Sequence, residues 1–236
     1  MKHTLFVCFF ILLSGFSFSQ STDISNKETY LEGIKRELQI KWPENRTIDL
    51  VFHGHSVPAG YFKTPIVNSF DSYPLLVLKG LKEIYPFVVV NSINTAIGGE
   101  DSESGQKRFK KEVLSHQPDI LFIDYALNDR RIGLEASKKA WEKMIVKALK
   151  KNIQVILLTP SPDLKVNLTE PGNELDLHRQ QIIALAKKYE VGLVDSYRIF
   201  QNLQETCDCV KDYMSQGNHP NEKGHQLIAT EILTYF

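Results

Sequence analysis

Short apolar runs recur along this chain and alternate with amphipathic stretches. The runs are near-continuous and several are rich in Val and Ile, which is typical of parallel strands covered on both faces. They lie at Ile48–Phe52, Phe87–Ile93, Ile120–Tyr125, Ile153–Leu158 and Val191–Val194. Helices are expected at Lys27–Trp42, Leu134–Lys150 and Leu175–Tyr189, with a last helix running from the capping residue Asn221 to Tyr235.

This alternation predicts the fold class. Repeated strand–helix units imply right-handed βαβ crossovers, and therefore an α/β protein built as a three-layer α/β/α sandwich around a parallel, five-stranded sheet. The 236 residues, 42% of them hydrophobic, suffice for one sizeable core. The 28 basic residues balance 28 acidic ones and form no long run of like charge, so the charge pattern does not favour a nucleic-acid partner.

The N-terminus has a different composition from the rest of the chain. Met1–His3 is basic, Leu5–Leu13 is apolar, and Ser17 and Ser19 are the small residues that a signal-peptide cut after Ser19 requires. We expect a signal peptide at 1–19, a leader and helix at 20–46, and a globular domain at 47–236. A membrane anchor is the alternative, but the apolar segment is short for a bilayer. The expected location is secreted or periplasmic, with no stable membrane anchor after cleavage.

Two cysteines, Cys207 and Cys209, remain after that cleavage. An oxidising compartment permits a disulfide between them, so a small clip and two free thiols are both open. Two thiols without a nearby histidine do not make a four-ligand zinc site. We expect no metal and no organic cofactor.

Polar residues of catalytic type follow three of the predicted strands. Ser56 follows the first, Gly98-Gly99 the second and Asn128-Asp129 the third, while His219 precedes the last helix. The carboxyl ends of parallel strands are where α/β folds bind ligands. A serine hydroxyl becomes a nucleophile when a base such as histidine lies within hydrogen-bond reach.

The remaining two elements suit an oxyanion hole. A backbone N–H at Gly99 and the side-chain amide of Asn128 are donors that can hold developing negative charge. Each element alone also has a structural interpretation as a cap or a turn. Ser56 does not lie in a Gly-x-Ser-x-Gly elbow, because Pro58 stands where the second glycine would be. The combination, rather than any single motif, indicates hydrolase chemistry.

Taken together, these elements resemble the SGNH, or GDSL-type, serine hydrolases. The matching segments are Gly54-His-Ser56, Ala96-Ile-Gly-Gly99, Ala126-Leu-Asn-Asp129 and Gln216-Gly-Asn-His219-Pro. The resemblance implies a flavodoxin-like sheet and ester hydrolysis through an acyl-serine, with oxyanion donors from Ser56 N–H, Gly99 N–H and the Asn128 side chain.

Three positions depart from the family pattern. His55 replaces the aspartate that usually precedes the serine, Ala126 replaces a glycine, and Gln216 replaces the aspartate that usually orients the histidine. The triad acid is therefore open. Gln216, Asp212 or a backbone carbonyl could orient His219, and we favour a Ser–His dyad with a neutral orienter.

The expected activity is hydrolysis of a short acyl ester, acetyl first, on a carbohydrate. A lysophospholipase or thioesterase on the same fold, and a weakly catalytic glycan-binding module, are the alternatives. Arg130 and Lys63 are candidate contacts for an anionic substrate, because arginine suits carboxylate binding, or they are solvated or paired surface cations.

Overall fold

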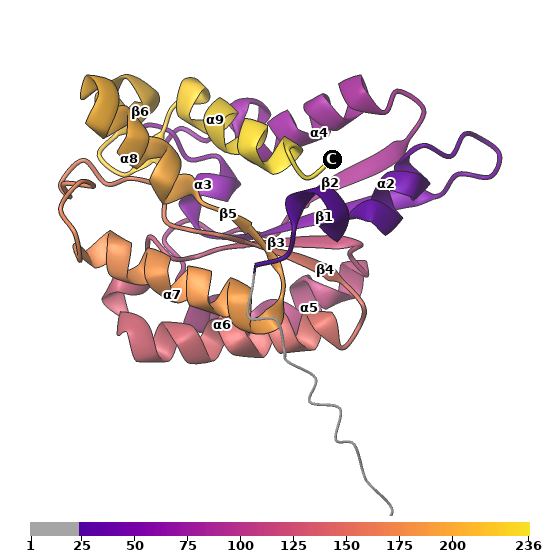
Figure 1. Ribbon diagram of the computed structural model, residues 1–236, viewed down its shortest axis with the longest axis horizontal. Coiled ribbons are helices and arrows are strands. Elements are labelled where there is room, and N and C mark those ends of the chain that lie inside the picture. Colours follow the sequence, from indigo (N-terminus) through magenta and orange to yellow (C-terminus); the bar gives the residue numbers. More distant parts are fainter. Residues whose placement is uncertain (1–23) are drawn as a thin grey trace, which may run out of the picture.

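A parallel sheet forms the middle layer of the molecule (Figure 1). The structure is a computed structural model, and it describes residues 24–236. The strands lie in the order β2-β1-β3-β4-β5. Their bounds are β1 Thr47–Gly54, β2 Val89–Asn94, β3 Ile120–Asp124, β4 Gln154–Leu158 and β5 Gly192–Val194. All residues of β3 are buried, which explains why central strands read as continuous apolar runs. The predicted α/β sandwich is confirmed.

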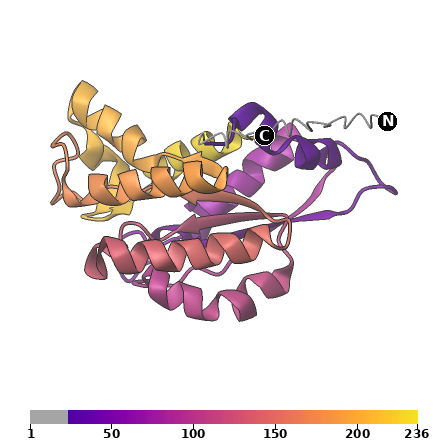
Figure 2. The ribbon, with the colours of Figure 1, turned by 60° about the horizontal axis from the view of Figure 1, so that its bottom comes forward.

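Helices cover both faces of the sheet. Those of the described chain are α1 Lys27–Tyr30, α2 Glu32–Leu38, α3 Ser56–Ala59, α4 Tyr73–Ile84, α5 Ser102–Glu112, α6 Gly133–Leu149, α7 Glu174–Tyr189, α8 Ser196–Cys207 and α9 Glu222–Leu233. Helices α4, α8 and α9 pack on one face and α5, α6 and α7 on the other (Figure 1). Figure 2 shows α5 and α6 side by side beneath the sheet. Two apolar clusters result, one in each space between sheet and helices.

Several elements differ from the sequence prediction. The single helix expected at Lys27–Trp42 is two short helices, α1 and α2, because Leu31 between them leaves helical geometry (φ −100°, ψ 18°). Helices α4, α5 and α8 were not predicted. Helix α5 has a strongly polar sequence that hides its periodicity, and its only buried large apolar residue is Phe109.

A small antiparallel hairpin was also missed. Its strands are β6 Met214–Gln216 and β7 His219–Pro220, and the 3-10 turn η4 (Val210–Tyr213) precedes it. The remaining 3-10 turns are η1 Ser69–Asp71, η2 Leu114–His116 and η3 Asp129–Arg131. The hairpin is short enough that sequence periodicity gives no signal for it, yet it carries the candidate base.

The predictions for the two cysteines and for the N-terminus have different outcomes. Cys207 and Cys209 form a disulfide, so the clip is the correct alternative. The expected signal peptide at 1–19 lies outside the described residues. Within residues 24–236, no helix is long and apolar enough to cross a membrane, and no cluster of metal-binding side chains is found.

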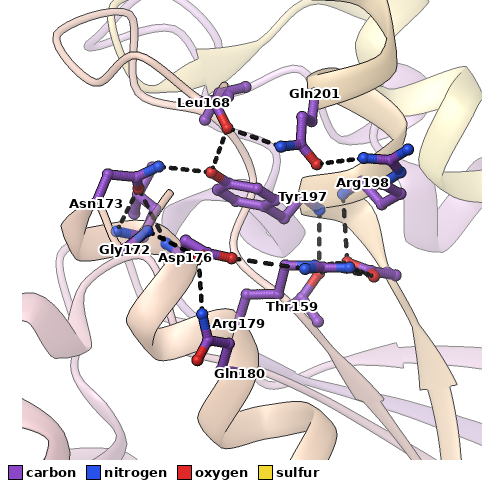
Figure 3. Close-up of polar contacts among 12 residues, drawn as sticks. Thr159, Leu168, Gly172, Asn173, Asp176, Arg179, Gln180, Tyr197, Arg198 and Gln201 are labelled. Carbon is purple, nitrogen blue, oxygen red and sulfur yellow. Dashed lines mark hydrogen bonds and ion pairs between the residues drawn. The ribbon is translucent and has the colours of Figure 1, made fainter. Parts of the chain in front are cut away.

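A polar network fixes the long loop that follows β4, at 159–173 (Figure 3). The Tyr197 hydroxyl donates to the Leu168 carbonyl at 2.6 Å and accepts from the Asn173 amide at 2.7 Å. Arg179 binds the Asp195 carboxylate, which also accepts from the Thr159 hydroxyl. The loop is therefore held against α7 and α8 although it has no secondary structure of its own.

Candidate active site

The site lies at the carboxyl ends of β1 and β3, where the strand order reverses. Strand β2 follows β1 in the chain but lies on its other side from β3, and ligands bind at such a switch point in doubly wound sheets. Gly54 ends β1 against β3. A Cβ there would lie 2.4 Å from the Asp124 carbonyl oxygen, so only glycine permits this approach. The chain then turns directly into α3, which begins at Ser56.

Ser56 and His219 meet at this edge. The Ser56 Oγ lies 2.9 Å from Nε2 of His219, and both side chains are nearly buried. Pro58 is in the first turn of α3, where its missing N–H costs no helical hydrogen bond. His219 is held in the β6–β7 hairpin. Asn221, the first residue after the hairpin, caps α9 by accepting from Gly224 N–H. The geometry is that of a nucleophile and its base.

The candidate oxyanion donors lie after β1, β2 and β3. Gly99 has φ +77°, a conformation that favours glycine, in the turn between β2 and α5. Within residues 24–236, the backbone N–H groups of Ser56 and Gly99 donate to no protein acceptor. The Asn128 amide donates one hydrogen to the Glu100 carbonyl at 2.9 Å, which leaves its second hydrogen available. All three groups expected as oxyanion donors thus keep an N–H that is free to bind a substrate oxygen.

The buried carboxylate of Asp129 and the partly buried carboxylate of Glu100 fix the segments that carry these candidate donors. Asp129 accepts from Ser102 N–H, the Ser137 hydroxyl and the Trp141 indole, and so ties the turn after β3 to α5 and α6. Glu100 accepts from the Tyr125 hydroxyl at 2.8 Å and from the guanidinium of Arg108.

Glu100 also fixes the positions of Gly99 and Asn128. It follows Gly99 in the chain and its backbone carbonyl holds Asn128, so its anchored side chain positions both donors. Sequence reasoning missed this role of Glu100. The only available signal was an acidic residue beside the double glycine.

Nδ1 of His219 has two close neighbours. The Phe62 carbonyl oxygen and the Gln216 side-chain nitrogen each lie 2.8 Å from it. Burial lowers the pKa of His219, although the Phe62 carbonyl acts in the opposite direction, and the nearby His55 adds to the lowering.

Asp212 does not take part. It is exposed, and no hydrogen bond joins its carboxylate to His219 among the described residues. Of the two groups that face Nδ1, only the Phe62 carbonyl can accept its proton, because Gln216 presents its nitrogen.

The candidate substrate-binding cations have different surroundings. The Arg130 guanidinium pairs with Asp163 at 2.8 Å and with Glu174, and its Nε donates to the Leu127 carbonyl. Arg130 is therefore a paired cation, which is one of the alternatives that the sequence left open. Lys63 is exposed on the loop after α3 and forms no ion pair within the described chain.

The chain belongs to the GDSL-like lipase/acylhydrolase family, whose model matches residues 52–227. It is therefore a serine hydrolase of the carboxylic-ester class. A search of curated proteins found no match.

Solved structures share the fold at low sequence identity. An acetylxylan esterase, Axe2 from Geobacillus stearothermophilus, is 19% identical with a TM-score of 0.70, over 80% of this chain and 93% of that one. A two-domain esterase (CEX) active on acetylated mannans is 21% identical with a TM-score of 0.72, over 92% of this chain and 55% of that one. A putative GDSL-like lipase from Parabacteroides merdae ATCC 43184 is 19% identical with a TM-score of 0.68, over 83% of this chain and 98% of that one.

Proposed function

We propose that this protein removes short acyl groups, acetyl first, from an exported or extracellular carbohydrate. The observation that carries the proposal is the 2.9 Å contact between Ser56 Oγ and His219 Nε2. Two of the structural neighbours act on acetylated xylan or acetylated mannans, which supports the carbohydrate part. The expected signal peptide at 1–19 would bring the enzyme to such polymers.

The reaction proceeds through an acyl-serine. Ser56 Oγ attacks the ester carbonyl carbon while His219 Nε2 takes its proton, and the carbonyl oxygen becomes an oxyanion held by Ser56 N–H, Gly99 N–H and the Asn128 amide. The C–O bond to the sugar then breaks, and the imidazolium returns the proton to the sugar oxygen. Water, activated by His219, attacks the acyl carbon and releases the carboxylic acid.

A cavity beside the catalytic hairpin supports a sugar substrate. It has a volume of about 170 Å³ and lies between the loop after β4 and the turn η4. Leu164 and Val166 give it apolar surface, while Gln204, Asp208 and Lys211 give it hydrogen-bonding groups. Leu164 N–H donates to the Gly217 carbonyl in the turn of the hairpin that carries His219, although Ser56 and His219 do not themselves line the cavity. Mixed walls of this kind suit a sugar ring, which has both hydroxyl and C–H surfaces.

Exposed apolar side chains favour a second candidate, a lysophospholipase or thioesterase. Ile66 and Val67 are 59% and 46% exposed on the loop that reaches Gln216, and Ile97 is 47% exposed just before Gly98. A longer acyl chain could cover these residues and gain hydrophobic free energy. The two candidates differ in the acyl length that the enzyme prefers.

The test combines substrate profiling with covalent labelling. Acetate release from acetylated xylan and acetylated mannan is compared with hydrolysis of p-nitrophenyl esters of increasing chain length. We expect the acetyl esters to be preferred and Ser56→Ala to lose at least about a thousandfold in kcat with an unchanged circular-dichroism spectrum. Ser115→Ala, an exposed serine on the surface, is the matched control.

Labelling by a fluorophosphonate separates an enzyme from a binding module. The wild type and Ser115→Ala should be labelled, and Ser56→Ala should not. A preference for octanoyl over acetyl esters would favour the second candidate. An unlabelled wild type that still binds glycan would support the non-catalytic alternative instead.

A further inference from the structure

The base has an unusual environment at its second nitrogen. Nδ1 of His219 is faced at the same distance, 2.8 Å, by an acceptor, the Phe62 carbonyl, and by a donor, the Gln216 amide nitrogen. One ring nitrogen has a single in-plane direction for a hydrogen bond, as donor or as acceptor. The two neighbours therefore compete, and each favours a different tautomer of the imidazole.

Thr64 fixes the orientation of the Gln216 amide. Its backbone N–H donates to the Gln216 Oε1 at 2.9 Å, and its hydroxyl accepts from the Gln216 Nε2 at 3.1 Å. A backbone N–H can only donate, so it requires the oxygen end of the amide. The nitrogen end must then point at His219. The Gln216 oxygen, which could have replaced the missing carboxylate, is turned away from the base.

The Phe62 carbonyl is held equally firmly. The Phe62 ring stacks on His225 at 5.1 Å between centroids, with 9° between the planes. His225 is fully buried, and its Nδ1 accepts from Tyr73 N–H at 3.2 Å. The Phe62 N–H donates to the Ile66 carbonyl, which closes the loop. Neither neighbour of Nδ1 can therefore move away easily.

The two tautomers differ in chemical competence. With the proton on Nδ1, donated to the Phe62 carbonyl, the lone pair of Nε2 faces Ser56 and can take its proton. With Nδ1 accepting from Gln216, the proton is on Nε2, and the ring cannot act as the base. The imidazolium formed during attack also keeps its Nδ1–H close to the positive end of the Gln216 amide dipole.

We propose that Gln216 is a positioning residue that restrains the esterase, because its Thr64-anchored amide holds part of the His219 population in the tautomer that cannot deprotonate Ser56. This inference rests on the proposed function, since it assigns His219 as the base. One competing hydrogen bond amounts to about two- to tenfold in a tautomer equilibrium. Relief of that competition should raise kcat and leave KM unchanged.

Two variants of the full chain test the proposal. Gln216→Met keeps the length of the side chain and removes the competing N–H, so kcat should rise by about two- to tenfold. Gln216→Glu keeps the shape, lets one carboxylate oxygen accept from Thr64 N–H and the other from His219 Nδ1–H, and should raise kcat and move the acid limb of kcat/KM to higher pH. Gln226→Met, an exposed change on α9, is the matched control and should leave all values unchanged.

A readout independent of turnover accompanies the kinetics. Long-range proton–nitrogen NMR on ¹⁵N-histidine-labelled protein reports which ring nitrogen of His219 carries the proton. We expect a mixed population in the wild type that shifts towards Nδ1–H in Gln216→Met and Gln216→Glu.

The opposite results would overturn the proposal. A fall in kcat for Gln216→Met, or a wild-type His219 already entirely in the Nδ1–H form, would show that Gln216 does not restrain the base. Failure of the proposed function appears differently, as an unlabelled Ser56 and no ester hydrolysis in any variant, while the NMR measurement still decides the tautomer.

Discussion

Nε2 of His55 lies 3.3 Å from the Oδ1 of Asp124, and both side chains are buried behind the nucleophile. The Nδ1 of His55 accepts from Val57 N–H in the first turn of α3, so the ring proton is on the nitrogen that faces Asp124. The two atoms face each other without forming a hydrogen bond in this structure. The carboxylate also accepts from the Tyr73 hydroxyl at 3.0 Å. His55 stands where the family has an aspartate directly before the serine, and the carboxylate of Asp124 at the end of β3 faces it.

This relationship predicts a compensating pair. His55→Asp alone restores the family residue but buries two carboxylates together, so it should lower the free energy of unfolding by at least about 2 kcal/mol. His55→Asp combined with Asp124→Asn removes one of the charges and should recover much of that loss. Urea unfolding of the two single variants and the double variant gives the coupling energy. Additive effects of the two substitutions would contradict a direct interaction between these positions.

The surroundings of Arg130 predict a structural role. Because both sides of its guanidinium bind carboxylates, Arg130→Ala should lower thermal stability and change KM for anionic and neutral esters alike. Lys63 is the candidate cation that stays free to meet an anionic substrate, and Lys63→Ala should raise KM for anionic esters only. Initial rates on matched ester pairs with and without a carboxylate measure both effects. If Arg130→Ala raised KM for anionic esters only, Arg130 would be a substrate-binding residue, as its sequence position suggested.

The strand ends could be predicted from the sequence because buried parallel strands leave a local signal. The runs before Ser56, Gly98 and Asn128 place those residues at one edge once the sheet is parallel. The supports of the site come from distant loops and helices. Phe62 reaches His219 only because the loop after α3 folds back, and its stacking on His225 joins residues far apart in the sequence. No periodicity carries such information, which is why the sequence could suggest a backbone carbonyl beside His219 but could not name Phe62.

The pH profile of activity follows from the pKa of His219. Burial lowers that pKa, so the imidazole stays neutral down to a lower pH than an ordinary histidine does. The acid limb of kcat/KM should therefore have its midpoint below about pH 6.5, the usual histidine value. Asp212→Asn should leave both this midpoint and kcat unchanged within about threefold, because the carboxylate is exposed and away from the ring. A thousandfold loss of kcat in a folded Asp212→Asn protein would make Asp212 the triad acid after all.

Two buried histidines predict how stability depends on pH. Burial is the main cause that lowers the pKa of His225 and of His53, each to about 3. A histidine with a depressed pKa in the folded state binds its proton more readily when unfolded, so its stabilising contribution is present above about pH 6.5 and is lost as the pH falls towards about 3. Between about pH 7.5 and pH 5, each should lower the free energy of unfolding by about 2 kcal/mol.

The measurement that checks this is urea unfolding at these two pH values. His225→Gln offers Tyr73 N–H an uncharged acceptor in place of Nδ1 and removes one titrating group. Its unfolding free energy should therefore fall by about 2 kcal/mol less than that of the wild type over the same pH interval. His116→Gln, at an exposed position, should keep the full pH dependence of the wild type. If His225→Gln and the wild type lose equal stability on acidification, the buried His225 ring does not govern the acid sensitivity of the fold.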